Sequence, residues 1–302
     1  KFTLVSHDGL NYKQMSILKK DLDGAVLWSS RSVKRQLENG EYTTDSIGEY
    51  KRFDYKTGTL SVTEAADYDD ENRREAQLTV DEENGKVFWN GTEIENVWGF
   101  GKTENENGKK RSAELYGSIT TVNGIDIMYV WRYIITSDDI PVAIESTACF
   151  LINNGKAIFI GKDYNVENAA RLGNSIYIGT RGYAQTVFKH PFSKSMLFRY
   201  DEGGDMLDIT ESFGDYHTVK LIGEANGLLY LKCEWCPNRV FYGSGYHEIA
   251  AASDGYFTYD GNDELRITKI ANYRYSDEDL FAPNGDIYAL TYWNGSIQKV
   301  TD

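Results

Sequence analysis

The stretch KCEWCPN, residues 232–238, holds Cys233 and Cys236, two of the three cysteines in the chain. Cysteines at this spacing occur in thiol–disulfide redox centres and as half of a zinc site. A redox pair needs a following helix to stabilise its thiolate, and the sequence predicts no helix here. A zinc site needs further ligands, and the remaining cysteine, Cys149, stands alone. The residues therefore favour a structural role for these thiols.

We predict instead that residues 227–243 form a hairpin. Apolar residues alternate along its first half and place Cys233 on a buried strand face. Pro237 suits the second position of a type I turn, and VFYG, residues 240–243, begins the return strand. Cys233 and Cys236 then point to opposite faces, which disfavours a disulfide between them.

A second group that could do chemistry is acidic. Asp67, Asp69 and Glu71 alternate as the first ligands of a calcium loop do. The pattern lacks the glycine expected at the sixth position, where Asn72 stands, and the acid expected at the twelfth, where Leu78 stands. We expect a solvated acidic loop and no cofactor, with an irregular structural calcium site at these three residues as the alternative.

Carboxylates are also the catalytic groups of glycosidases, which need two of them at a set separation. Candidates near predicted turns are Asp138, Asp139, Glu145, Asp163 and Asp201. With 46 acidic residues in the chain, nothing in the sequence selects a pair. No nucleophile elbow, phosphate loop, dinucleotide fingerprint or HExxH motif is present. The sequence names no catalytic residue and leans against an enzyme.

The elements that would position such groups follow a repeated pattern. Asn-Gly or Asp-Gly precedes a short apolar run that carries an aromatic residue, as in LDGAVLW, VNGIDIMY and PNGDIY. Glycine suits a tight turn that needs positive φ, and an aromatic side chain packs on a half-buried sheet face. The pattern indicates strands joined by tight hairpins.

Several stretches read as complete hairpins, with apolar residues at every second position. These are residues 51–65, 149–161, 196–210, 255–270 and 288–300. The best candidate for a helix, residues 30–40, is short, and we expect a loop or a helical turn there.

The hairpins recur at intervals of about 50 to 60 residues, which is room for four short strands. The repeat resembles that of β-propellers, although no particular family is recognised. We predict an all-β chain whose residues 1–302 form a single propeller of six four-stranded blades, with five or seven as alternatives. An N-terminal hairpin within residues 1–18 pairs with the C-terminal strands and closes the ring.

Composition restricts the partners. The net charge is −14, and the basic runs are short, so we expect no nucleic-acid partner. No apolar run is long enough to span a bilayer, so we expect no membrane insertion. The acidic, tyrosine-rich and cysteine-poor composition suits an extracellular or cell-surface protein, with a phage virion as the alternative. The oligomeric state is left open.

The aromatic residues near predicted turns are the candidate binding residues, because exposed tryptophan and tyrosine stack on sugars or anchor protein partners. They are Trp98, Trp131, Tyr292 and Trp293. The sequence predicts a non-enzymatic binding or structural module that presents its loops to a protein or glycan partner. The alternative is a carbohydrate-active enzyme, a glycoside hydrolase or lyase with carboxylates at the channel mouth.

Overall fold

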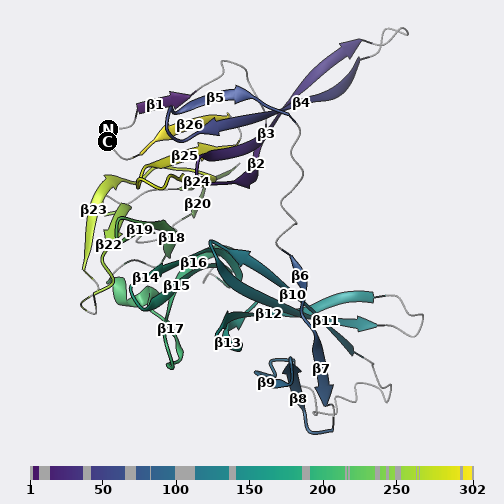
Figure 1. The fold of residues 1–302 in the computed structure, drawn as a ribbon. Helices are drawn as coiled ribbons and strands as arrows, with labels where there is room; N and C mark the ends of the chain where they lie inside the picture. Colours follow the sequence, from purple (N-terminus) through teal and green to yellow (C-terminus); the bar gives the residue numbers. More distant parts are fainter. Residues whose placement is uncertain are drawn as a thin grey trace. The chain divides into compact units, whose positions relative to one another are not determined.

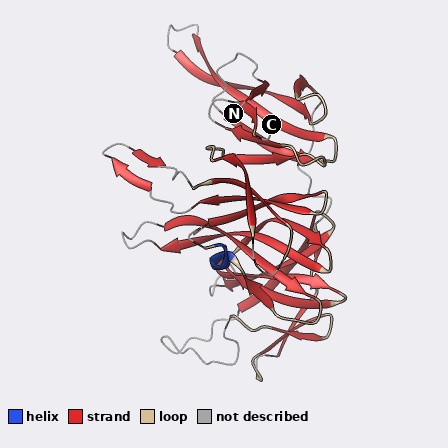
Figure 2. Ribbon diagram, turned by 90° about the vertical axis from the view of Figure 1, so that its left-hand side faces the viewer, coloured by secondary structure: helices blue, strands red, loops and turns tan. Residues whose placement is uncertain are grey.

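The computed structural model describes the strands and most of their connections. The described residues are 3–6, 14–36, 42–64, 73–81, 83–98, 113–135, 141–185, 191–214, 216, 218–234, 239–242, 245–248, 253–262, 264, 266–292 and 295–300. Within them, regular structure consists of β-strands and one short 3₁₀ turn, Thr210–Phe213 (Figure 2). The predicted all-β fold is confirmed. The chain divides into two compact units, which are described separately: residues 1–70 with 222–302, and residues 71–221.

The first unit contains a four-stranded antiparallel sheet in chain order, β2-β3-β4-β5. Its strands are Gln14–Lys20, Gly24–Gln36, Tyr42–Asp54 and Thr59–Val62. The hairpin predicted at residues 51–65 is confirmed by the pairing of β4 with β5. The loop or helical turn predicted at residues 30–40 is wrong, because β3 pairs with β4 at every position as far as Gln36.

A second sheet of this unit joins the two ends of the chain in the order β1-β26-β25-β24 (Figure 1). Its strands are Thr3–Ser6, Ser296–Lys299, Ile287–Thr291 and Glu278–Phe281. The pairing of β25 with β26 confirms the hairpin predicted at residues 288–300. The predicted N-terminal hairpin is wrong, because β1 completes the edge of β26 while β2 pairs with β3 in another sheet. A single strand therefore makes the terminal pairing.

A third sheet has the order β18-β19-β22-β23. Its strands are Thr218–Ala225, Leu228–Glu234, Gly255–Tyr259 and Ile267–Asn272. The hairpin predicted at residues 255–270 is confirmed, but the one at 227–243 is wrong. The strand β19 pairs with β22, and the return segment forms its own two-stranded ribbon, β20 (Arg239–Tyr242) with β21 (Gly245–Glu248). In the sequence, Pro237 thus precedes the inserted ribbon and not the strand that pairs with β19.

The second unit holds three sheets of antiparallel strands, ordered β13-β12-β11-β10-β6, β14-β15-β16-β17 and β7-β8-β9. The five strands of the first are Lys156–Lys162, Pro141–Asn153, Ile125–Ile135, Ala113–Val122 and Arg74–Glu75. Those of the second are Asn165–Leu172, Ser175–Gln185, Pro191–Asp201 and Met206–Asp208. Those of the third are Leu78–Asp81, Lys86–Trp89 and Thr92–Ile94. The hairpins predicted at residues 149–161 and 196–210 are confirmed.

The core of each unit lies between neighbouring sheets, where alternate residues of the strands meet. In the second unit Ile127 and Leu151 of one sheet pack with Ile178 and Phe198 of the next. In the first unit Phe53, on β4, packs with residues of β25, on the adjoining sheet. The period-2 pattern of the sequence therefore places apolar side chains at the interfaces between sheets.

Four Asn-Gly pairs form the two-residue loops that the sequence predicts. They join β8 to β9, β10 to β11, β12 to β13 and β18 to β19. In each loop both residues have positive φ, for example 49° at Asn123 and 77° at Gly124, as a type I′ turn requires. This turn matches the right-handed twist of the strands that it joins.

Candidate functional site

The first unit contains a buried ion pair, Lys232 with Asp279. The two side chains are 6% and 1% exposed, and Lys232 Nζ lies 3.7 Å from Asp279 Oδ2. Burying either charge alone is unfavourable by roughly several kcal/mol, so each charge needs a compensating partner inside the protein. The pair is therefore a specific feature of the fold, and we treat its surroundings as the candidate site.

Hydrogen bonds connect the pair through Ser276. Lys232 Nζ donates to Ser276 Oγ over 2.8 Å, and Ser276 Oγ donates to Asp279 Oδ1 over 2.8 Å. The Tyr256 hydroxyl donates a further bond of 3.0 Å to the same Asp279 oxygen. Two hydroxyl groups thus donate to one oxygen of the carboxylate, Oδ1.

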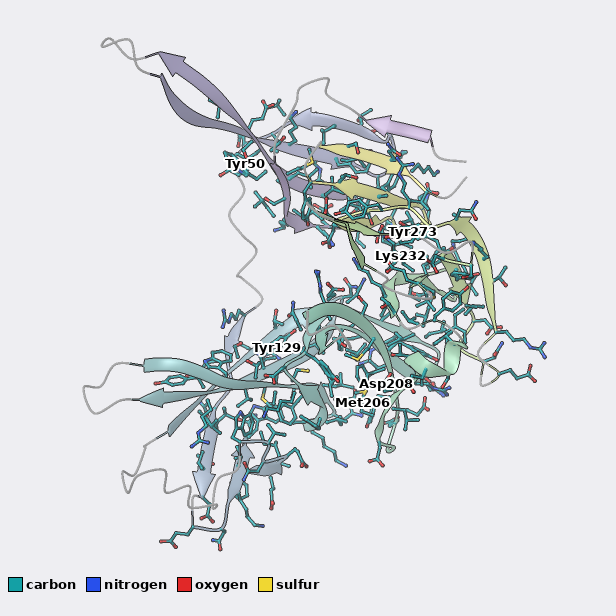
Figure 3. All side chains as sticks on the ribbon, turned by 180° about the vertical axis from the view of Figure 1, so that it is seen from behind. Tyr50, Tyr129, Met206, Asp208, Lys232 and Tyr273 are labelled. Carbon is teal, nitrogen blue, oxygen red and sulfur yellow. The ribbon has the colours of Figure 1, made fainter. Side chains whose placement is uncertain are left out.

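Two tyrosine rings flank the ammonium group, which lies 5.4 Å from the ring centroid of Tyr256 and 4.9 Å from that of Tyr273. Figure 3 shows Lys232 and Tyr273 next to each other. The negative ring faces attract the cation, most strongly where water is excluded. We name the five residues Lys232, Tyr256, Tyr273, Ser276 and Asp279 the Lys232 site.

Strand register brings the Lys232 site together. Lys232 and Tyr256 are direct partners across β19 and β22. Tyr273 follows the end of β23 and donates its backbone amide to the carbonyl of Asp254 over 3.2 Å, which holds it beside β22. Asp279 comes from β24 of the neighbouring sheet. The site therefore ties two sheets of the first unit to each other.

Burial, with the nearby charge of Asp279 and the hydrogen bond to it, raises the pKa of Tyr256 well above its ordinary value. The phenol consequently stays neutral and keeps donating its proton to the carboxylate. Ionising Tyr256 would place a second negative charge beside Asp279 in a site that excludes water.

The order lysine–serine–carboxylate superficially resembles an activated nucleophile. In this site, however, Lys232 Nζ donates to Ser276 Oγ, and the Ser276 hydroxyl donates to Asp279 Oδ1. The hydrogen bonds therefore run from the lysine through the serine to the carboxylate, and we describe the Lys232 site as a clamp between strands.

Sequence reasoning missed the Lys232 site, although one signal was present. Lys232 stands in the strand sequence LLYLKCE, whose other residues are mainly apolar. A lysine within such a strand needs a buried partner or an exposed face. The partner, Asp279, is far along the chain and carries no signal of its own.

The predicted binding residues do not gather in one place among the described residues. Trp98 lies in the core of the second unit at 5% exposure, and its carbonyl accepts a 2.8 Å bond from Arg132 Nη1. Trp131 is half-buried beneath the guanidinium group of Arg73, which lies 5.7 Å from its ring centroid. Their role in binding stays a prediction.

The other two belong to the C-terminal region. Tyr292, in the first unit, donates its backbone amide to Asp277 Oδ2 over 2.6 Å and its hydroxyl to Glu278 over 3.3 Å. Trp293 lies outside the described residues. For Tyr292, too, a binding role stays a prediction.

The calcium candidates Asp67, Asp69 and Glu71 also lie outside the described residues. Among the residues that are described, no three metal-ligating side chains converge. A structural calcium ion at the acidic loop stays a prediction.

Two of the candidate carboxylates accept hydrogen bonds from nearby strands. Asp163 Oδ1 accepts the amide of Thr147 over 3.0 Å. Asp201 accepts the Ser175 hydroxyl and, over 3.0 Å, Arg199 Nε, and these bonds lower its pKa below the ordinary value. Asp138 and Asp139 lie outside the described residues, as does the side chain of Glu145.

The described thiols are those of Cys149 and Cys233, and both are free and buried. Burial raises the pKa of Cys149 to about 12 and that of Cys233 further. Their position on the inner faces of strands confirms the buried face predicted for Cys233. Cys236 lies outside the described residues.

We expect both thiols to resist alkylation in the native protein. At pH 9 roughly one Cys149 in a thousand is a thiolate, because its pKa of about 12 is far above that pH. Raising the pH towards 12 increases the thiolate fraction. Labelling should still stay slow until the fold opens, because burial also keeps the reagent away from the sulfur. Mass spectrometry after iodoacetamide treatment checks this, with urea-unfolded protein as the control. Rapid native labelling of Cys233 would contradict its burial.

No helix among the described residues is long and apolar enough to cross a membrane.

Comparisons with known proteins were made by sequence and by structure. No protein-family model and no curated protein matches the chain. By structure, it is similar to the β-propeller domain of the Trilobed protease from Pyrococcus furiosus, reported to have an open velcro topology. The TM-score is 0.31 at 12% identity, and the match covers 96% of this chain and 97% of that one.

A second similar structure is that of Pyrococcus horikoshii acylaminoacyl peptidase. The TM-score is 0.35 at 12% identity, and the match covers 96% of this chain and 52% of that one. This chain therefore spans about half the length of that peptidase.

These comparisons bear on two predictions from the sequence. The resemblance to a generic β-propeller architecture is confirmed, while the number of blades and the closure of the ring stay predictions. The non-enzymatic binding or structural module is contradicted, because the similar structures are a protease's propeller domain and a peptidase.

Proposed function

We propose that this chain is a peptidase-type propeller, which takes up polypeptide in an extended form and presents it to a peptidase active site. The observation that carries the proposal is the presence of two-stranded ribbons that run beyond the ends of their sheets. Their outer backbone edges are suited to pairing with an extended chain.

The longest ribbon belongs to β3 and β4 in the first unit (Figure 1). The pairing between β2 and β3 ends at Ser30, and that between β4 and β5 begins at Lys51. The paired positions from Arg31↔Ile47 to Gln36↔Tyr42 have no further strand beside them among the described residues. We name this segment the β3–β4 ribbon.

The second unit repeats the arrangement at β15 and β16. The strand β14 reaches only Arg181, and β17 reaches only Phe198. The pairs from Gly182↔Lys194 to Gln185↔Pro191 extend past both, again within the described residues. Two different sheets therefore carry ribbons of the same kind.

A strand edge presents a row of backbone N–H and C=O groups, which an extended peptide satisfies by adding a strand. A peptide bond must also be extended and accessible before it is cut, since bonds within helices and sheets are already paired. The ribbons thus favour polypeptide over glycan as the ligand. They supply the binding edges, and the proposal places the catalytic groups in another domain or chain.

The test uses a labelled, unstructured peptide and fluorescence anisotropy with the purified chain. A deletion that replaces residues 31–47 with an Asn-Gly turn removes the β3–β4 ribbon and leaves its four-stranded sheet. We expect this deletion to weaken peptide binding several-fold without changing the thermal midpoint of unfolding. The same peptide with methylated backbone nitrogens should bind the intact chain more weakly, because it loses its donors.

The matched control shortens the ribbon by only its last two pairs, which should weaken binding less than the full deletion. Equal binding by the chain with and without the ribbon would overturn the proposal. So would equal binding of the methylated and unmethylated peptides, because strand addition depends on backbone hydrogen bonds.

A further inference from the structure

The four two-residue Asn-Gly turns, at Asn90, Asn123, Asn154 and Asn226, share one chemical liability. Asparagine followed by glycine can cyclise, because glycine has no side chain to hinder attack by its backbone nitrogen. The four residues Asn90, Asn123, Asn154 and Asn226 all have exposed side chains and similar φ values between 49° and 55°. Exposure and backbone conformation therefore do not distinguish them, and any difference must come from their contacts.

Two of the four side chains are tied to a neighbouring sheet of the second unit. Asn123 Nδ2 donates to Asn168 Oδ1 over 2.6 Å and to the carbonyl of Ala169 over 3.1 Å. Asn154 Nδ2 donates to Glu202 Oε1 over 2.9 Å. Each bond holds the amide that would have to turn towards the following glycine and leave.

In the first unit the turn at Asn226 is held at both reacting groups. The attacking atom, Gly227 N, donates to Glu224 Oε1 over 3.0 Å. Asn226 Nδ2 lies 3.5 Å from the carbonyl of Asn284, which it faces as a weak donor. Attack at this turn requires both contacts to break.

Asn90 differs from these three. Its side chain makes no hydrogen bond to any residue that the structure describes, and its turn ends a hairpin in which β9 has only three residues. Short hairpins with exposed ends open locally at low free energy. We infer that, among these four two-residue turns, Asn90 deamidates spontaneously well ahead of the other three.

The reaction needs no partner but water. The backbone nitrogen of Gly91 loses its proton and attacks Cγ of Asn90, the Cγ–Nδ2 bond breaks, and ammonia leaves. Water then opens the cyclic imide to aspartate or isoaspartate. The product carries one more negative charge, and isoaspartate lengthens the two-residue loop that a type I′ turn requires.

The experiment incubates the native protein at 37 °C in mildly alkaline buffer and measures isoaspartate by mass spectrometry in the peptides that hold these four turns. We expect Asn90 to convert several-fold faster than Asn123 and Asn154. In urea the tethers are lost, and the four rates should become similar. The same ranking in urea as in the native protein, or native rates that do not differ, would overturn the inference.

A variant tests the tether itself. Glu202→Ala removes the acceptor that holds Asn154, and Glu202 is exposed, so the fold is expected to tolerate the change. Deamidation at Asn154 should rise several-fold in this variant and stay unchanged in the control Glu211→Ala, whose side chain is exposed in the same unit. No rise in the Glu202→Ala protein would show that the contact does not protect.

Discussion

Replacing Lys232 with methionine should lower the free energy of unfolding by about 3–5 kcal/mol, measured by urea denaturation. Methionine keeps the length and apolar stem of lysine but removes the charge that compensates Asp279. The carboxylate, 1% exposed, then remains buried without the charge of Lys232 beside it. The loss reflects that uncompensated charge and not the strength of the intact pair.

The control is an ion pair on the protein surface whose charged atoms are closer together than those of Lys232 and Asp279. Lys86 Nζ lies 2.7 Å from Glu93 Oε2, but both side chains are about half exposed, at 45% and 54%. Lys86→Met should leave the free energy of unfolding nearly unchanged, because water replaces the lost partner. The double variant Lys232→Met with Asp279→Leu should recover most of the loss. If Lys232→Met is no more harmful than Lys86→Met, the burial of the pair is wrong.

Tyr288→Ala should lower the free energy of unfolding by about 3–5 kcal/mol, the range for removing a buried aromatic ring. Tyr288 is 3% exposed and joins β25 to the neighbouring sheet. Its ring lies edge-on to Phe53 at 5.0 Å between centroids and stacks with Tyr55 at 6.2 Å and 7°. The substitution leaves a cavity between the sheet that joins the two ends of the chain and the β2-β3-β4-β5 sheet.

The matched control for this prediction is Tyr288→Phe. It keeps the ring and removes only the 3.0 Å hydrogen bond from the hydroxyl to the carbonyl of Tyr55, so the loss should be about 1 kcal/mol. Urea denaturation monitored by tyrosine and tryptophan fluorescence compares the two variants. Equal losses would mean that the ring does not fill the space between the sheets.

The Asn-Gly pairs show how far local sequence goes. An Asn-Gly pair predicts a type I′ turn, and positive φ at Asn90, Asn123, Asn154 and Asn226 confirms it for these four pairs. Asn84 and Asn284 also precede glycine but lack positive φ, so they do not form this turn. The reason is local, since few residues other than glycine and asparagine tolerate this conformation. What the asparagine side chain contacts is not local. Asn154 reaches Glu202 only because the next sheet lies beside its own.

The segment around Cys233 shows the opposite case. Alternation correctly predicts that Cys233 faces the core, because the side chains of a strand point to alternate sides. The turn signal at Pro237 wrongly suggests that the next strand is its partner. The partner of β19 is instead β22, beyond an inserted ribbon. Backbone hydrogen bonds are the same for every residue type, so a sequence does not specify which strand completes an edge.

The sequence by itself determined the all-β character, the tight turns and the buried face of most strands, since each depends on residues close together in the chain. The repeat also predicted that the N-terminal segment pairs with the C-terminal strands, and β1 does pair with β26. Tertiary structure alone decided that a single strand and not a hairpin makes this pairing, and that Lys232 meets Asp279. Lys232 and Asp279 lie far apart in the chain, where neither propensity nor periodicity carries information. Their contact is stabilising because burying either charge without the other is unfavourable.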